Sequence, residues 1–155
     1  MVRRAGTFDG AMSHDDLPPD WTTQPLDDPR LLAAAVDLFT LDADRRRGCL
    51  VVLLCDGETR LLQPLVVDDV PLDCSAQQQA TTMDKLARVV QQVCPGGALA
   101  LAVGRPGLAV PTLWEHGWRT ALAAACRSHQ LTALGCFLAT PRGVVRLDGD
   151  EAEAA

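Results

Sequence analysis

The sequence lacks the segments and motifs that most directly reveal a function. No apolar run approaches the roughly 18 residues that a membrane span needs, and the basic N-terminal sequence is not followed by the apolar stretch of a secretory signal. The G-x-S-x-G elbow of many hydrolases, the P-loop and the dinucleotide-binding fingerprint are also absent. We therefore expect a cytoplasmic chain with no membrane partner and no cofactor.

Lysine is nearly absent, and the balance of charge is acidic. Lys85 is the one lysine, and the formal net charge is -6. Because an acidic chain repels phosphate backbones, we do not expect a nucleic-acid partner. The preference for Arg over Lys and the abundance of Ala and Val are typical of a G+C-rich bacterial genome. A length of 155 residues with 48% hydrophobic residues fits one globular domain rather than a disordered chain.

The six cysteines show no metal-binding or redox spacing. No two of them are separated by two residues, and none has a His at ligand spacing. Free cysteine behaves as a small hydrophobic residue, and without a secretory signal a reducing compartment is expected. We therefore predict buried, unpaired thiols at Cys49, Cys55, Cys74, Cys94, Cys126 and Cys136.

Two tails flank the part of the sequence that has regular apolar periodicity. Residues 1–27 contain three prolines, several aspartates and little periodicity, which predicts a flexible tail whose Trp21 docks onto the domain surface. Residues 28–148 alternate between helical and strand patterns, and residues 149–155 form a short acidic tail. We expect one domain over residues 28–148, between the two tails.

Three helices are predicted within this domain. Asp28 and Pro29 are typical of an N-cap and a first helical position, and the apolar stripe after them predicts one helix that ends at residues 45–48. A T-x-x-D pattern predicts a second helix over residues 81–94. A T-x-x-E capping box predicts a third helix over residues 112–129.

Five apolar runs of strand length alternate with these helices. The first run, CLVVLLC, is apolar throughout, and we expect it to form a central strand that is covered on both faces. The Asp-Gly turn after this run predicts a hairpin with the second run. The order of elements predicts an α/β fold, a mixed β-sheet of about five strands with helices on its faces. The runs are residues 49–55, 60–70, 98–103, 132–138 and 143–147.

The isolated polar residues do not combine into a catalytic group. His14 lies in the tail, and His116 and His129 lie about 20 Å apart along one predicted helix, so they cannot share a metal ion. Asp68 and Asp69 point to opposite faces of a predicted strand. The arginines at 45–47 predict a solvated connection, with a phosphate or an acidic partner as the alternative contact.

The segment of residues 100–118, ALAVGRPGLAVPTLWEHGW, has a distinctive order of elements. An apolar strand is followed by x-Arg-Pro-Gly, a loop, and Pro-Thr-x-x-acid at the start of a helix. This order resembles the JAB/MPN metalloprotease-like fold, in particular its bacterial RadC-like branch, over residues 29–147. The resemblance implies the layering of JAB and cytidine-deaminase-like folds. The zinc motif of the family is H-x-H-P, then a loop, then S-x-x-D at the start of a helix.

Compared with that motif, the zinc ligands are replaced. Val103 and Arg105 stand in place of the two His ligands, Pro106 matches the proline, and Thr112 and Glu115 stand for the Ser and the Asp. Valine has no lone pair to donate, and arginine is a permanent cation that repels a metal ion. The resemblance therefore implies a degenerate member of the family, with no metal and no catalytic residue.

Two roles remain open for the charged residues of this segment. In the first role Arg105 fills the vacated metal position and pairs with Glu115, and this pair either closes the cleft of the former zinc site or recognises a carboxylate. In the second role Arg105 lies in a surface loop, and Glu115 caps its helix and pairs with Arg119 one turn along. The general-base Glu of the family has no counterpart, because Glu58 lies in the predicted hairpin turn.

These features favour a non-catalytic binding or scaffold protein, a pseudo-enzyme whose partner is another protein or a second copy in a homodimer. One alternative is a hydrolase with an unrecognised site that uses cysteines or His116. The other is a homo-oligomeric structural protein. The apolar stripe of Trp114 and Trp118 is interpreted as core, and as the interface in this last alternative.

Overall fold

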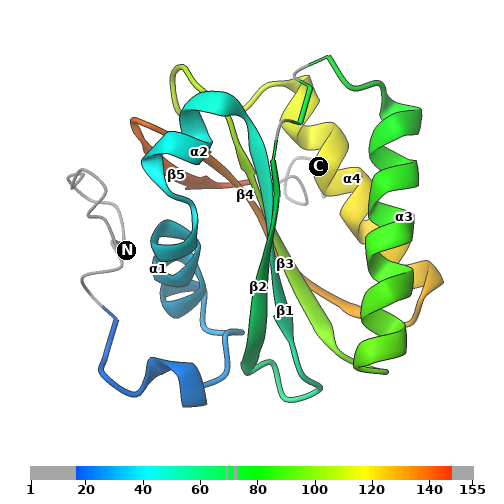
Figure 1. Cartoon of the computed structure of the whole chain (residues 1–155). Coiled ribbons are helices and arrows are strands. Elements are labelled where there is room, and N and C mark those ends of the chain that lie inside the picture. The colour runs from blue at the N-terminus through cyan, green and yellow to red at the C-terminus, as the bar shows by residue number, and fades with distance from the viewer. Residues whose placement is uncertain (1–16, 69, 72, 148–155) are drawn as a thin grey trace, which may run out of the picture.

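The computed structural model describes residues 17–68, 70–71 and 73–147. In this part of the chain a mixed sheet of five strands lies between two helical layers, with α1 and α2 on one face and α3 and α4 on the other (Figure 1). The predicted α/β fold class is therefore confirmed. The helices are α1 (Pro29–Phe39), α2 (Asp42–Arg47), α3 (Ala76–Val93) and α4 (Leu113–Ser128), and a short 3-10 helix, η2 (Trp21–Thr23), precedes them.

The strands lie in the order β2-β1-β3-β4-β5. β1 pairs antiparallel with both β2 and β3, which confirms the predicted hairpin. β3 and β4 are parallel and are connected through α4, because a parallel pair needs a crossover. β5 pairs antiparallel with β4. The strands, each within two residues of its predicted bounds, are β1 (Cys49–Cys55), β2 (Leu61–Asp68), β3 (Ala98–Gly104), β4 (Thr132–Thr140) and β5 (Gly143–Arg146).

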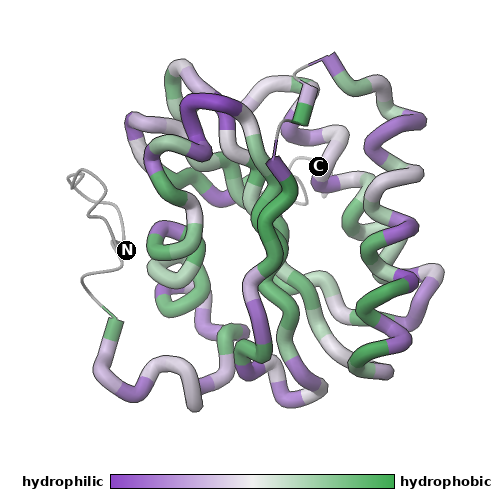
Figure 2. The backbone as a smooth tube through the Cα atoms, viewed as in Figure 1, coloured by the Kyte–Doolittle hydropathy of each residue, from purple (hydrophilic) through white to green (hydrophobic). Residues whose placement is uncertain are grey.

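The core consists of two apolar clusters, one on each face of the sheet. Leu50 and Leu101 belong to the cluster under α3 and α4, and their neighbours Val51 and Ala100 belong to the cluster under α1. β1 and β3 are buried along their whole length and are apolar throughout, so the strands between the helical layers are largely green in Figure 2. β1 is paired on both edges and buried on both faces, as predicted for a central strand, and β3 beside it is the third of the five strands.

The predicted first helix is two helices. α1 begins as expected, with the Asp28 carboxylate capping the first turn and Pro29 at the first helical position. It ends at Phe39, because Thr40 leaves the helical conformation at φ -104° and ψ 89°. The Thr40 hydroxyl donates a hydrogen bond to the carbonyl of Val36 at 2.7 Å, a local contact by which threonine competes with helical geometry. The prediction of one helix up to residues 45–48 is therefore wrong.

α3 starts at Ala76, before the T-x-x-D pattern at residues 81–84 that predicts its start. Ser75 and Gln78 form a capping box ahead of that pattern. Ser75 Oγ accepts a hydrogen bond from the Gln78 N–H at 3.1 Å, and Gln78 Oε1 accepts one from the Ser75 N–H at 2.8 Å. The predicted start is wrong because glutamine serves in a capping box as well as an acid does.

Residues 17–27 pack against the domain. Leu26 is fully buried in the cluster under α1, and its N–H donates to the Thr59 carbonyl at 2.8 Å. The Trp21 ring lies 6.0 Å from the Phe39 ring between centroids, so this tryptophan does dock on the domain surface. The folded chain therefore extends N-terminally of the boundary predicted at residue 28. Residues 1–16 and 148–155, which belong to the two predicted tails and the predicted end of the domain, lie outside the described residues.

All six cysteines are free, as predicted, and four of them are buried. The prediction of burial is wrong for Cys74 and Cys94, which are partly exposed because they lie in the loop before α3 and at the end of α3. Burial raises the pKa to about 11 for Cys49 and Cys126 and to about 12 for Cys55 and Cys136. These four thiols therefore stay protonated at neutral pH and behave as small core residues.

Gly104, the last residue of β3, lies where a side chain would collide with the core. A Cβ atom there would lie 2.6 Å from Cys49 Sγ and 3.5 Å from Arg45 Cα. We expect Gly104→Ala to lower the free energy of unfolding in urea by about 1–3 kcal/mol, as overpacking does. The loss is expected to be much smaller in a Cys49→Ala background, where the sulfur is gone. Equal losses in both backgrounds would contradict the collision.

Candidate functional site

The candidate residues lie at the carboxyl end of β3, next to the parallel strand β4. The Arg105 N–H donates to the Ala139 carbonyl of β4 at 3.1 Å. A loop over residues 105–112 then leads to α4, and Thr112 is the N-cap of that helix. Ligand sites of α/β sheets are found outside the carboxyl ends of parallel strands. This loop is therefore where a ligand site is expected.

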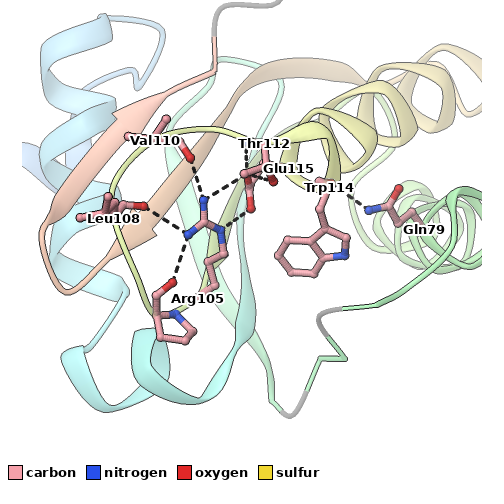
Figure 3. A network of polar contacts seen from close by, with 8 residues as sticks. Gln79, Arg105, Leu108, Val110, Thr112, Trp114 and Glu115 are labelled. Atoms are coloured by element: carbon pink, nitrogen blue, oxygen red, sulfur yellow. Dashed lines mark hydrogen bonds and ion pairs between the residues drawn. The ribbon is translucent and has the colours of Figure 1, made fainter.

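The guanidinium of Arg105 is fully engaged by its own loop (Figure 3). Nη1 donates to the carbonyls of Pro106 at 3.0 Å and Leu108 at 3.2 Å, and Nη2 donates to the carbonyl of Val110 at 2.8 Å. Nε and Nη2 also donate to the two carboxylate oxygens of Glu115. A guanidinium has five N–H donors, so none remains for an external anion.

Gly107 lets the loop curl around this side chain. Its φ of +103° lies in a region that residues with a side chain rarely adopt. A Cβ atom there would lie 3.3 Å from Arg105 Nη1, which is a tight approach. The Arg-Pro-Gly sequence thus supplies both the group that gathers the carbonyls and the glycine that brings them within reach.

Glu115 is fully buried although it is charged. Its carboxylate accepts hydrogen bonds from Arg105, from the Thr112 N–H and from Thr112 Oγ1, the last at 2.7 Å. Burial by itself would raise the pKa of Glu115, but the bonds from Arg105 and Thr112 outweigh burial and hold the pKa below its ordinary value of 4.5. Glu115 is therefore both a helix cap and the ionised partner of Arg105.

Four of the five residues that align with the zinc motif of the resemblance meet in this network. Arg105 and Glu115 form the ion pair of the first predicted role, and Thr112 forms the predicted capping box with Glu115. Pro106 contributes its carbonyl. Val103 takes no part, because its side chain is buried in the cluster under α3 and α4. The polar network therefore contains four of these residues, and Val103 lies outside it.

The second predicted role, an ion pair between Glu115 and Arg119, is not found. Glu115 does cap α4, but the cation beside its carboxylate is Arg105. Arg119 Nε is buried and has no hydrogen-bond partner among the described residues. Helical spacing favours Arg119, whereas the fold of the loop brings the guanidinium of Arg105 to the carboxylate.

Arg45, a second arginine at this end of the sheet, has a role that the sequence does not reveal. It is 1% exposed, so the prediction of a solvated connection at residues 45–47 is wrong for this residue. Its Nε donates to the Thr40 carbonyl at 2.7 Å, Nη1 to the Thr140 carbonyl at 3.0 Å, and Nη2 to Asp37 Oδ1 at 3.0 Å. Arg45 thereby ties α1 and α2 to the end of β4, while its two neighbours are exposed as predicted.

Three apolar side chains lie on the outside of the loop and at the start of α4. Leu108, Val110 and Leu113 are 59%, 61% and 88% exposed. The carbonyls of Leu108 and Val110 point inward to Arg105, as Figure 3 shows, whereas their side chains face solvent. In the sequence these three residues lie within six positions, at the end of the loop and the start of α4.

The remaining predicted polar residues lie away from the loop or outside the described residues. His129 Nε2 lies 2.8 Å from Asp84 Oδ1 and links the end of α4 to α3. His116 lies in the first turn of α4. Within residues 17–68, 70–71 and 73–147, no three His, Cys, Asp or Glu side chains are grouped so as to hold a metal ion. His14 and Asp69 fall outside these ranges, so the Asp68-Asp69 pair stays a prediction.

The contact between Asp84 and His129 predicts a stability difference that disappears in acid. The hydrogen bond with His129, helped by the charges of His129 and Arg88, holds the pKa of Asp84 below its ordinary value of 3.8. A lowered pKa stabilises the fold above the unfolded-state value, and this contribution is lost as the pH falls through the folded-state value. We expect Asp84→Asn to be less stable than wild type at neutral pH, and this difference to shrink as the pH falls through the folded-state pKa of Asp84. Urea unfolding across this range is the measurement, and a difference that does not change with pH would contradict the prediction.

A groove of about 720 Å³ lies beside the start of α3. Uncharged residues of α3 and of the preceding loop line it, and they include Cys74. Burial, together with the charge of Asp73, raises the pKa of Cys74. A thiol with a raised pKa is a poor nucleophile at neutral pH, so this groove does not favour the hydrolase alternative.

No family model matches the chain, and no curated protein or solved structure matches it either. In the described part of the chain, none of the helices combines the length and apolarity that crossing a membrane requires. A function must therefore be argued from the residues at the end of β3.

Proposed function

We propose that this chain is a non-catalytic protein-binding module, a pseudo-enzyme resembling JAB/MPN metalloproteases, and that it binds its partner through the loop of residues 105–112. The observation that carries the proposal is the pairing of Arg105 with Glu115. A catalytic acid, base or metal ligand needs a lone pair or an exchangeable proton that is free at the reacting atoms. All donors of Arg105 and the buried carboxylate of Glu115 are already used within the loop.

The surroundings of this pair also favour binding over chemistry. Arg105 is a fixed cation at the position of the second zinc-binding His in the resemblance, where it would repel a metal ion. Glu115 is held ionised by its partners and is not poised to exchange a proton at neutral pH. The loop therefore supplies a fixed shape with exposed side chains, which is what a partner recognises.

Affinity capture from a lysate of the source organism tests this proposal, with the wild-type chain, Arg105→Ala and Arg142→Ala as baits. Arg142 is an exposed arginine of the β4–β5 turn, and its variant controls for the loss of one positive charge. We expect one partner that the wild type and Arg142→Ala retain and Arg105→Ala loses. Capture that does not depend on Arg105, or a metal-independent catalytic activity that Arg105→Ala abolishes, would overturn the proposal.

Because Arg105→Ala removes several internal hydrogen bonds, its fold is checked by circular dichroism and urea unfolding. Arg105→Lys serves as a milder variant, since lysine keeps the charge but lacks the planar fork that gathers three carbonyls. We expect Arg105→Lys to capture the partner less well than the wild type and better than Arg105→Ala. Full capture by a folded Arg105→Lys would count against a role for the closed loop.

A further inference from the structure

Gln79 lies on α3, and its buried side-chain amide reaches α4. The side chain is 2% exposed, and Nε2 donates a hydrogen bond to the carbonyl of Trp114 at 2.9 Å (Figure 3). Burying an amide is unfavourable unless it is hydrogen-bonded, so this bond accounts for the position of the side chain. Trp114 is the second residue of α4 and directly precedes Glu115. The bond therefore ties the turn that carries the Arg105–Glu115 pair to the neighbouring helix.

Gly117 provides the space for this amide. It lies inside α4, where glycine is less favourable than alanine because it loses more conformational freedom on folding. A Cβ atom at this position would lie 2.2 Å from Oε1 and 3.0 Å from Cδ of Gln79. A side chain at position 117 would therefore displace the amide of Gln79, which explains a glycine at a helical position that otherwise favours alanine.

We propose that Gln79, seated against Gly117, is the positioning residue that holds the loop of residues 105–112 in place from α3, an inference that rests on the binding function proposed above. Gln79 acts through the backbone of Trp114. By fixing the first turn of α4 it places the carboxylate of Glu115, which accepts the hydrogen bonds that close the loop. A loop that is ordered before binding loses little conformational freedom when a partner docks. The affinity for the partner is therefore expected to depend on a side chain outside the loop.

The place of the bond on α4 favours this role over general helix packing. The ends of a helix open more readily than its middle, because their backbone groups lack part of their intrahelical partners. The bond from Gln79 reaches the second residue of α4, within the first turn, and Thr112 and Glu115 cap that same turn. Loss of the bond is therefore expected to loosen the first turn and the loop before it affects the rest of the sheet.

Hydrogen exchange followed by NMR on the whole chain tests this inference. Exchange of the Thr112 N–H and of the Arg105 Nε–H reports local opening of the loop, since both groups donate to Glu115. Gln79→Met keeps most of the side-chain volume but has no donor, and we expect both groups to exchange about three- to ten-fold faster in this variant, the effect of one hydrogen bond. Gln92→Met, at an exposed position of the same helix, is the matched control and should exchange like the wild type.

Gly117→Ala approaches the same contact from α4. The added methyl group displaces the Gln79 amide, so the loop should exchange faster, as in Gln79→Met. Because alanine favours the helix, the free energy of unfolding in urea should fall less than in Gln79→Met. A contact that only adds to packing predicts instead that exchange in the loop follows the free energy of unfolding in both variants.

A double-mutant cycle shows whether the two residues act through one contact. Gln79→Ala removes the amide and leaves room for a methyl group, so adding Gly117→Ala in that background should not speed exchange further. Three outcomes would overturn the inference. These are unchanged exchange in Gln79→Met, equally fast exchange in Gln92→Met, and an effect of Gly117→Ala that persists in the Gln79→Ala background.

The capture experiment described above separates this inference from the proposed function. Gln79→Met is expected to retain less of the Arg105-dependent partner than Gln92→Met does. Equal capture by these two variants would overturn the positioning role and leave the binding function in place. If exchange changes as expected but no captured partner depends on Arg105, Gln79 still orders the loop and the binding function is wrong.

Discussion

Replacing Arg45 with methionine is expected to lower the free energy of unfolding by about 3–5 kcal/mol, the cost of removing one partner of a buried ion pair. Methionine keeps much of the apolar volume of the side chain but removes the guanidinium. The Asp37 carboxylate then loses the guanidinium of Arg45, and the carbonyls of Thr40 and Thr140 lose the hydrogen bonds that it donates, in a site where Arg45 is 1% exposed. Urea unfolding at neutral pH, followed by circular dichroism, measures the change.

The matched control for this prediction is Arg46→Met in the same short helix. Arg46 is exposed and pairs with Asp42 one turn away, so its loss is expected to cost no more than about 0.5 kcal/mol. If the free energy of unfolding of Arg45→Met lies within about 1 kcal/mol of the wild-type value, the contacts of Arg45 with α1 and β4 do not stabilise the fold as proposed.

Glu115→Ala is expected to cost about 2–4 kcal/mol, because it leaves a partly buried arginine without its counter-ion and removes the cap of α4. The wild-type carboxylate accepts hydrogen bonds from two nitrogens of Arg105 and from the backbone and hydroxyl of Thr112. Glu58→Ala in the exposed hairpin turn is the control, since its surface pair with Arg60 contributes little. A loss equal to that of the control would show that the network does not stabilise the fold.

The same residue predicts how stability depends on pH. Because the pKa of Glu115 is lowered in the folded state, its contribution is present above the ordinary value of 4.5 and is lost as the pH falls through the folded-state value. Glu115→Gln has no such titration. We expect the stability difference between the wild type and Glu115→Gln to be greatest at neutral pH and to shrink on acidification.

The fold class follows from the sequence because its signals are local and strong. The continuous apolar runs that became β1 and β3 admit little besides strands covered on both faces, and the T-x-x-E box marks the start of α4 correctly. The order of the strands in the sheet does not follow from local signals, since it depends on which strand edges meet in space. For that reason the sequence predicts that β1 is a central strand, which is confirmed, but not that β3 separates it from β4.

The errors have physical causes that a single sequence does not display. At the break between α1 and α2 the Thr40 hydroxyl donates a hydrogen bond to the backbone carbonyl of Val36. Because threonine also occurs inside helices, its presence in the sequence does not predict the break. The burial of Arg45 depends on a carboxylate eight residues earlier and a carbonyl in β4. A run of three arginines contains no sign of which one turns inward.

The candidate site is predicted in part. The resemblance to a zinc motif places Arg105, Thr112 and Glu115 together, and the structure joins them through hydrogen bonds. The sequence does not predict that every N–H donor of Arg105 is occupied, because three of the acceptors are backbone carbonyls, which every residue has. The outward position of Leu108 and Val110 follows from the same carbonyls, so it is hidden from the sequence for the same reason.

The closure of the loop by Arg105 and Glu115 is tested most directly by a double-mutant cycle on urea unfolding. The four proteins are the wild type, Arg105→Met, Glu115→Gln and the double variant, all measured at neutral pH and low salt. A loop that is held shut by this pair predicts a coupling energy of about 1.5–3 kcal/mol between the two residues. Losses that simply add, to within about 0.5 kcal/mol, would mean that the two residues act independently and that the loop is not closed by their pairing.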